Sequence, residues 1–443
     1  MSTLNDVAIN KLSGGLGRRN PEQDMVSGLL FSGEETLNLK FDKIERLASL
    51  EDAEDLGITE SYDLSGQSAY YQIQQFFRMN PSGDLYIMVV DAASYADTVK
   101  KAIDMQEKAN GNIRQMAIIC SSETTFVQTK AALAIAQEQA NLAYTDYMPF
   151  EILLEGKGFD TASEATSPSL AFLNSENVSV VVAMDVEKAF EQKLIQKDTN
   201  KAYTLPPDEE LVPSQSASGV YNVKNSDGLK KDGSAVLEFV FIKDSYKNTA
   251  AVGLALGALS KAKVSENIAW IEKFNLTGNG FAKPGFVGGK ELKSLGELRT
   301  LNEKRYIFTQ THTGLAGVYF NDSHTCTTGT SDFAYIENNR TINKATRLLR
   351  TALLPKLASP VLVDIDGKLP QSVSKSFEDL CRNALEGMVA NQEVSAFDVY
   401  VDPKQNILAT SELKVKAEII PVGTARKIVV DLGFKNPFGI DKA

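Results

Sequence analysis

The chain has few of the side chains on which covalent and metal chemistry depends: 443 residues include three cysteines and two histidines. Cys120, Cys326 and Cys381 are odd in number and far apart, which excludes a disulfide framework and favours a reducing cytoplasm. His324, Cys326 and Asp322 lie close together, but no further cluster at zinc-site spacing and no orienting group accompanies them. We expect a solvated His–Cys loop pair, with no catalytic residue, metal or cofactor.

Long hydrophobic runs and an excess of positive charge are also missing. The longest apolar run, residues 250–259, is well short of the roughly 20 residues that span a bilayer. The first ten residues have neither the basic start nor the apolar run of a signal peptide. With 46 basic and 57 acidic residues, the net charge of −11 argues against nucleic acid, whose binding depends on cationic contacts. The composition therefore predicts a soluble intracellular protein without direct membrane insertion.

Motifs for phosphate binding and nucleophilic catalysis are absent. Gly14, Gly15 and Gly17 are not followed by Gly-Lys-Ser/Thr, and no Gly-x-Ser-x-Gly elbow occurs. Asp91 and Asp185 end two predicted strands, where α/β proteins often bind ligands, but no glycine fingerprint follows either strand. We interpret both as solvated aspartates. The alternative that stays open is an α/β nucleotide- or small-molecule-binding protein or enzyme that uses the sheet of residues 85–185.

Apolar strands that alternate with helices are present in the first half. Because buried parallel strands read as continuous apolar runs, this order predicts an α/β domain with helices on both faces of the sheet. The predicted strands are residues 26–31, 85–90, 116–120, 150–154 and 178–183, and the helices are 68–79, 95–109 and 124–143. Residues 197–231, which are polar and contain three prolines, are interpreted as a long loop or boundary.

The second half predicts an α+β core. Gly253 and Gly257 indicate close helix packing within a helix over residues 249–261. The predicted strands are residues 235–242, 306–308, 316–320, 361–365, 396–401, 412–420 and 426–432, and the main helices are 338–354 and 375–391. Residues 421–424 are predicted as the turn between the last two strands. The predicted domains are 1–20 (arm), 21–233 (α/β), 234–424 (α+β core) and 425–443 (C-terminal strand and tail).

Both ends have the character of strand-forming arms. Residues 6–12 alternate apolar and polar side chains ahead of a glycine-rich tether, and residues 426–432 alternate likewise. Such segments are suited to pairing with a sheet edge elsewhere. The apolar side chains of the predicted arms are Val7, Ile9, Leu12, Ile428, Val430 and Leu432.

A cationic stripe runs along the predicted helix of residues 338–354. It consists of Arg340, Lys344, Arg347 and Arg350, opposite an apolar stripe. One hypothesis is a docking surface for a partner. The other is a solvated helix face whose charges pair with nearby acids, and the sequence favours neither.

The order of these segments resembles contractile phage tail sheath proteins. In the core, LNEKRYIF, GLAGVYF, a polar loop with Ser331-Asp332-Phe333 and a helix with Arg340 and Arg347 carry the resemblance. The closing segments FEDLCRNALEGMVANQEVSAFDVYVDPKQN and LKVKAEIIPVGTARKIVVDLGF are similar to the family's last helix, strand and terminal hairpin. VSGLLFSGEE and YYQIQQFFRMNPSGDLYIMVV resemble its N-terminal half, whereas residues 92–233 match weakly.

The resemblance implies a non-enzymatic subunit that stacks in six-fold rings around an inner tail tube and exchanges its terminal arms with neighbours. It also implies baseplate and tail terminator proteins as partners, assembly in the cytoplasm of a bacterial host, and a final location in a virion tail or contractile injection apparatus. The basic stripe would then face the tube. A tube or connector subunit is the other structural alternative, which the length of the chain disfavours.

Overall fold

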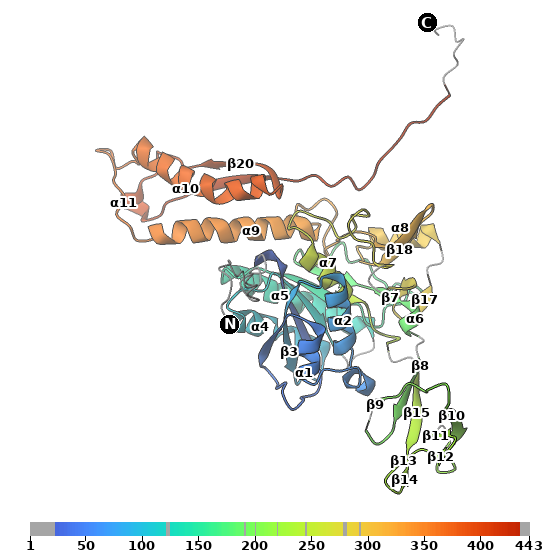
Figure 1. Ribbon diagram of the computed structural model, residues 1–443. Coiled ribbons are helices and arrows are strands. Elements are labelled where there is room, and N and C mark those ends of the chain that lie inside the picture. Colours follow the sequence, from blue (N-terminus) through green and yellow to red (C-terminus); the bar gives the residue numbers. More distant parts are fainter. Residues whose placement is uncertain are drawn as a thin grey trace, which may run out of the picture.

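A computed structural model describes residues 23–434 except 121–124, 190–191, 200, 219, 244–245, 278–280 and 292–293. It has a central body, a small β insertion that projects from the body, and an elongated C-terminal module (Figure 1). From the module the chain passes back over the body and then runs outward as a single extended segment (Figure 1). The mixed α/β, multi-domain architecture predicted from the sequence is confirmed.

The body is built on a six-stranded sheet in the order β2-β3-β1-β4-β5-β6. All neighbouring strands are parallel except β2, which is antiparallel to β3. The strands are β1 (Val26–Ser32), β2 (Ile44–Leu47), β3 (Asp84–Val90), β4 (Gln115–Ile119), β5 (Glu151–Glu155) and β6 (Val178–Val181). In the centre Leu30 pairs with Met88 on one side and Ile118 on the other, and all three are fully buried.

Helices cover both faces of this sheet, as predicted. The connections β1→β3 and β3→β4 run in opposite directions, so right-handed crossovers place their helices on opposite faces. One face carries α2 (Ala69–Met79), after α1 (Leu50–Asp55), and α7 (Val252–Lys261), which contacts α2, β1, β4 and β5. The other face carries α3 (Tyr95–Val99), α4 (Ala102–Lys108) and α5 (Phe126–Thr145).

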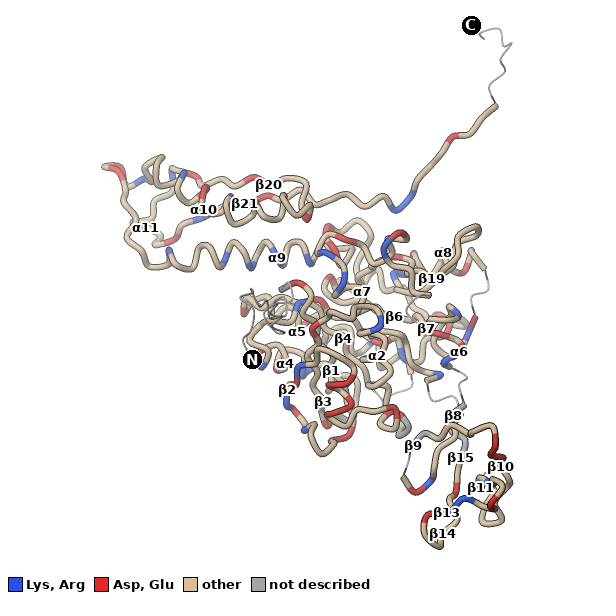
Figure 2. The backbone as a smooth tube through the Cα atoms, viewed as in Figure 1, with Lys and Arg blue, Asp and Glu red and all other residues tan. Residues whose placement is uncertain are grey.

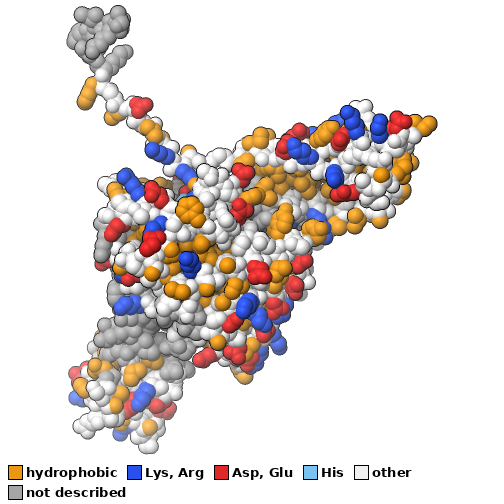
Figure 3. Space-filling view, turned by 180° about the vertical axis from the view of Figure 1, so that it is seen from behind, with side chains coloured by type: hydrophobic (Ala, Val, Ile, Leu, Met, Phe, Trp, Pro, Cys, Tyr) orange, Lys and Arg blue, Asp and Glu red, His pale blue; other side chains and the backbone are white. Residues whose placement is uncertain are grey.

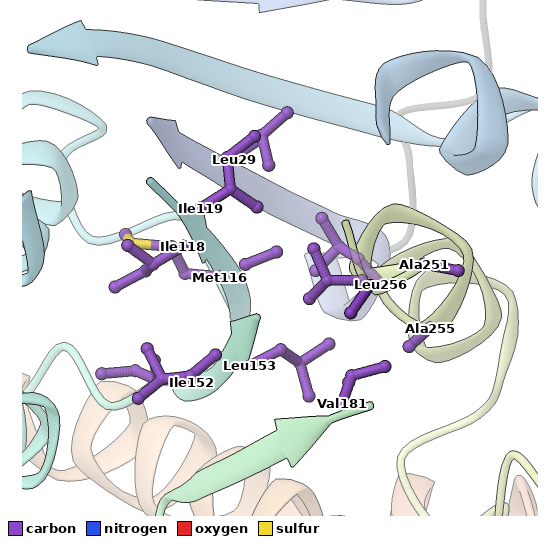
Figure 4. Packing of buried hydrophobic residues seen from close by; sticks show 14 of the residues in the cluster. Leu29, Met116, Ile118, Ile119, Ile152, Leu153, Val181, Ala251, Ala255 and Leu256 are labelled. Atoms are coloured by element: carbon purple, nitrogen blue, oxygen red, sulfur yellow. The ribbon is translucent and has the colours of Figure 1, made fainter. Parts of the chain in front are cut away.

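Helix α7 lies unusually close to α2. A Cβ on Gly253 would stand 2.1 Å from the backbone oxygen of Gln72, and one on Gly257 would stand 2.8 Å from Met79 Cβ. The Gln72 side chain bridges the helices, because its Nε2 donates to Ala250 O and its Oε1 accepts from Gly253 N, both at 2.7 Å. Figure 4 shows Leu256 and Ala255 beside the sheet residues that complete this core. The close packing predicted from the glycine spacing is confirmed.

The predicted long loop is wrong, because residues 192–243 form an antiparallel β insertion. Its strands are β8 (Gln192–Gln196), β9 (Lys201–Ala202), β10 (Glu210–Pro213), β11 (Val220–Asn225), β12 (Gly228–Leu229), β13 (Lys231–Asp232), β14 (Ala235–Val236) and β15 (Glu238–Lys243). Its fully enclosed apolar cluster is small, namely Leu194, Val223 and Phe239. So small a core leaves most side chains in water, which is why the sequence looks like a linker.

The remaining elements of the body continue one apolar core, which runs from Val26 to Ile336 and so extends across the predicted boundary at residues 233–234. These elements are η1 (Gln23–Met25), η2 (Tyr62–Ser65), β7 (Ala183–Asp185), α6 (Val186–Ala189), β16 (Pro284–Phe286), β17 (Lys290–Glu291), α8 (Leu295–Glu303), β18 (Thr309–His312) and β19 (Leu315–Phe320). The predicted strand at residues 306–308 contributes a parallel bridge between Ile307 and Val181 at the edge of the main sheet.

The C-terminal module begins with helix α9 (Ile336–Leu353). It continues through η4 (Leu354–Lys356), α10 (Gln371–Ala390), β20 (Val394–Tyr400), α11 (Ile407–Thr410) and β21 (Lys416–Pro421). A separate apolar cluster joins α9, α10 and the two strands around Cys381, Leu385 and Val399. The strand predicted at residues 361–365 does not form: Leu362 and Ile365 are 76% and 102% exposed and have no core to enter.

Candidate assembly interface

The two strands of the C-terminal module form a sheet with open edges. β20 and β21 are antiparallel, with Phe397 opposite Ile419 and Tyr400 opposite Lys416. Among the described residues neither strand has a second neighbour. Unpaired edge N–H and C=O groups are a template on which another chain can add a strand.

The segment after β21 is extended and exposed. Residues 422–434 belong to no strand, so the predicted hairpin between 412–420 and 426–432 is wrong: β21 pairs with β20 instead. Ile428, Val430 and Leu432 are 81%, 76% and 95% exposed, and Figure 3 shows the segment standing clear of the body. An apolar segment without cover in its own subunit is the kind of surface that marks a contact with a partner. The N-terminal residues Val7, Ile9 and Leu12 lie outside the described residues.

Arg426 anchors this segment where it leaves the body. Its guanidinium donates to Asp322 (Nε to Oδ2, 3.0 Å) and to Glu337, and lies 3.4 Å from the centre of the Tyr335 ring. Both acids are buried, and Ser323 also donates to the Glu337 carboxylate. Burial raises the pKa of Glu337, and the charge of Arg426 opposes that shift. Removing Arg426 would therefore leave two buried carboxylates without their cation.

A hollow of about 1270 Å³ lies beside this anchor. Its lining includes Arg426 and Ile428 together with Trp270 and Leu295, which are partly exposed. The start of the extended segment therefore forms part of the wall of this hollow.

The stripe on α9 is largely engaged in contacts within the subunit. Basic residues follow one another along this helix (Figure 2), but Arg340 is 3% exposed. Its guanidinium donates to three backbone oxygens, those of Asp24, Ala262 and Lys263, at 3.2–3.3 Å. Burial lowers the Arg340 pKa to about 10, and the charge of Asp24 opposes that shift. This arginine fixes the start of β1 and the end of α7 to α9.

Lys344 and Arg347 are bound within the subunit as well. Lys344 Nζ lies 2.6 Å from both Asp24 and Glu393, and Arg347 lies 2.7 Å from Asp24. Burial raises the pKa of Asp24, but the cations, led by Lys344, outweigh burial and leave that pKa below its usual value. Arg350 lies over the Tyr147 ring, 3.5 Å from its centre. The interpretation as a face that pairs with acids thus fits Lys344 and Arg347, although the acids and cations are largely buried rather than solvated.

Amide side chains on α9 hold a buried carboxylate of the main sheet. Glu151, the first residue of β5, accepts hydrogen bonds from Asn339 (3.2 Å), Asn343 (3.0 Å) and Asn177 (3.0 Å). Asn339 and Asn343 are four residues apart and so lie on the same side of the helix. Burial raises the pKa of Glu151 to about 7, and the three amides oppose this shift. The first half of α9 is therefore docked on the body by polar contacts.

The His–Cys pair is buried, which corrects the expectation of a solvated loop. His324 is 2% exposed and its Nε2 lies 2.8 Å from Asn302 Oδ1. Burial lowers the His324 pKa to about 3 and raises the Cys326 pKa to about 12. Both groups are therefore neutral at pH 7, a state unsuited to a thiolate nucleophile.

The strand-end aspartates differ from each other. Asp91 is exposed as expected, whereas Asp185 is buried and accepts hydrogen bonds from the backbone N–H groups of Ala282 (2.8 Å) and Lys283 (3.1 Å). In the described part of the chain no group of three or more His, Cys, Asp or Glu side chains could hold a metal ion. None of the described helices combines the length and apolar character that crossing a bilayer requires.

Solved structures with this fold come from contractile assemblies. The contracted helical sheath of the anti-feeding prophage is 13% identical in sequence, with a TM-score of 0.57 over 98% of this chain and 100% of that one. A chain of the six-fold symmetrised baseplate of the same prophage gives the same values. The contracted sheath complex of the extracellular contractile injection system PVC is 11% identical, with a TM-score of 0.54 over 98% of both chains. The sheath-like fold expected from the sequence is confirmed.

Family models match nearly the whole sequence. No curated protein sequence matches this chain. Residues 4–324 match the model described as DUF2586, N-terminal domain, and residues 332–439 match DUF2586, C-terminal domain. The chain therefore belongs to the DUF2586 family.

Proposed function

We propose that this protein is the sheath subunit of a contractile tail or injection apparatus. One observation carries the proposal: an exposed apolar segment, residues 428–432, occurs in the same chain as a two-stranded sheet, β20–β21, whose outer edges pair with no other strand in the described part of the chain. The segment offers a strand, and the sheet offers edges to which a strand can add. A copy that donates its terminal segment to a neighbour's sheet satisfies the apolar side chains of one and the backbone groups of the other.

Strand exchange also suits a lattice that changes shape. Main-chain hydrogen bonds between an arm and a neighbour's sheet involve no contact between the bodies, so they persist while the bodies slide or rotate. On this basis the subunits form stacked six-fold rings around an inner tube, and contraction drives the tube through a target envelope. The N-terminal arm with Val7, Ile9 and Leu12 and the C-terminal arm with Ile428, Val430 and Leu432 are the proposed strands.

The other proposed partners follow from this role. The inner tail tube lies inside the rings, and baseplate and tail terminator proteins close the two ends. Assembly takes place in the bacterial host cytoplasm, and the finished sheath belongs to a virion tail or an injection apparatus. The proposed role is structural and requires no catalytic group.

Electron microscopy of the concentrated protein tests the proposal. The wild type is expected to form rings or short tubes. Chains lacking residues 1–20, or residues 428–443 with Arg426 kept, are expected to stay monomeric with nearly unchanged melting temperatures. A wild type that stays monomeric at high concentration and is stabilised by a nucleotide in a thermal-shift screen would overturn it in favour of an α/β binding protein. Loss of the fold in either truncated chain would show that the arm packs within its own subunit.

A further inference from the structure

The starting points of both terminal segments are bound to one face of the same helix. Asp24 lies at the start of the described chain, and its carboxylate binds Lys344 and Arg347 of α9 at 2.6 and 2.7 Å. Arg426 lies where the C-terminal segment leaves the body, and it binds Glu337 in the first turn of α9.

Helix geometry explains how one face serves both ends. Glu337, Arg340, Lys344 and Arg347 follow one another at spacings of three or four residues, which keeps them in one row. At about 1.5 Å rise per residue, Glu337 and Lys344 are separated by roughly 10 Å along the axis. The charge of the side chains changes sign along this row. The acid at its start binds the C-terminal segment, and the cations after it bind the N-terminal segment.

Most of the side chains that form these ion pairs are shielded from water. The side chains of Asp24, Lys344 and Arg347 are 12–17% exposed, and those of Asp322 and Glu337 are 8% and 3% exposed, whereas the Arg426 side chain is 30% exposed. The ion pairs of Asp24 are therefore screened little by salt, and at the Arg426 anchor it is the two carboxylates that are buried and would be left unpaired. Lys344 also binds Glu393, directly before β20, so the N-terminal anchor is linked to the open-edged sheet.

We propose that α9 is the spacer that fixes where the two arms leave the subunit, with Asp24 and Arg426 as its anchor residues. This inference rests on the proposed function for its role in the lattice: arms that reach different neighbours from fixed points set the spacing between those neighbours. Arg426 is a positioning residue, because it acts on the direction of the arm and not on the strand that the arm forms.

The anchor can be tested in dilute protein before assembly. The three native cysteines are buried, so cysteines introduced at the exposed positions Lys427 and Glu107 accept spin labels selectively. Distances between the two spin labels are measured by pulsed electron paramagnetic resonance, once with Arg426 intact and once with Arg426→Gln. We expect the distance distribution to become at least twofold broader without the arginine, with Arg426→Lys intermediate. Equal widths in all three proteins would overturn the anchor.

The proposed role of α9 in the lattice is tested by the assembly of protein that carries no spin labels. We expect Arg426→Gln and Asp24→Asn to reduce the assembled fraction at least tenfold, or to give tubes with altered twist and rise. Lys427→Gln removes the neighbouring positive charge outside the anchor and is expected to assemble like the wild type. Normal tubes from both anchor variants would overturn the spacer role. If the wild type itself forms no tubes, the proposed function fails, and the label distances still decide the anchor.

Discussion

The central sheet and the β20–β21 sheet treat their edges in opposite ways. In the central sheet, the edge strand β2 has only four residues. The outer edge of β6, at the other side, is covered by Ile307, whose N–H donates to Val180 O at 3.0 Å. Short or covered edges of this kind prevent unwanted pairing. The β20–β21 sheet has no such cover among the described residues, and Ile420 of β21 is exposed. The first sheet is closed to further strands, whereas the second leaves edges that the proposed strand exchange would use.

The largest effect is expected where the central sheet meets its helices. Gly253→Ala would bring a methyl group to 2.1 Å from Gln72 O, so α2 and α7 must separate. We expect a loss of about 3 kcal/mol or more in the free energy of unfolding, measured by thermal and chemical denaturation, or loss of soluble protein.

Gly387→Ala is the matched control for this change. A Cβ at Gly387, within α10, meets no atom within 4 Å. Alanine there is expected to stabilise the helix by roughly 0.5–1 kcal/mol. Equal effects of the two substitutions would contradict the close α2–α7 contact as the cause.

The arm should show the reverse pattern, with assembly lost and stability kept. Val430→Pro removes one backbone N–H and locks φ, which weakens any ladder that residues 426–432 form with a neighbour. Because Val430 is 76% exposed, the melting temperature of the monomer should not change. Sedimentation velocity is expected to find monomers where the wild type forms large assemblies. Val430→Thr keeps the N–H and the β-branch, so failure of both variants alike would point to the apolar side chain instead of the strand.

An effect of intermediate size on stability is expected at Glu151, through which α9 is docked on the body. The Glu151 pKa is raised from 4.5 to about 7 in the folded protein by burial, against the opposing Asn177, Asn339 and Asn343 hydrogen bonds. The folded state therefore holds the proton more tightly, so this contribution to stability is present at low pH and is lost as pH rises through about 7. Glu151→Gln has no proton to lose. Its melting temperature relative to the wild type should thus be higher at about pH 8.5 than at about pH 5.5.

The exposed residue Glu107 provides the control for the pH experiment. The melting-temperature difference between Glu107→Gln and the wild type should not change with pH in the same way. Glu155, whose pKa burial also raises to about 7, is present in every protein compared and drops out of the differences. A constant difference between Glu151→Gln and the wild type would mean that the buried carboxylate is already neutral or already charged throughout the range.

The sequence predicts best where local pattern and burial agree. The apolar runs of the central strands and the amphipathic helix of residues 338–354 identify elements whose ends differ from the structure by a few residues. The β insertion was missed because its core is too small to give an apolar pattern. The last hairpin was assigned to the wrong pair because residues 412–420 and 426–432 alternate alike, and the true partner of β21 lies across α11.

The assembly site was harder to predict than the fold. Arg426 gives no local signal, since its partners Asp322 and Glu337 lie 104 and 89 residues away. The basic stripe did give a signal, but a row of cations on a helix looks the same whether it faces water or acids from distant segments. Only tertiary contacts distinguish the two, and here they bring Asp24 and Glu393 to Lys344.

The smallest expected effect concerns Arg350, the member of the stripe that binds an aromatic ring instead of an acid. Its guanidinium lies over Tyr147, which is itself half-exposed. A cation–π contact at such a site contributes about 0.5–1 kcal/mol. We expect Arg350→Ala and Tyr147→Leu each to lower the free energy of unfolding slightly, and the double variant to lose less than their sum by about this coupling energy. Strict additivity would mean that Tyr147 does not hold Arg350, which would then be free to contact a partner, as in one of the two hypotheses for the stripe.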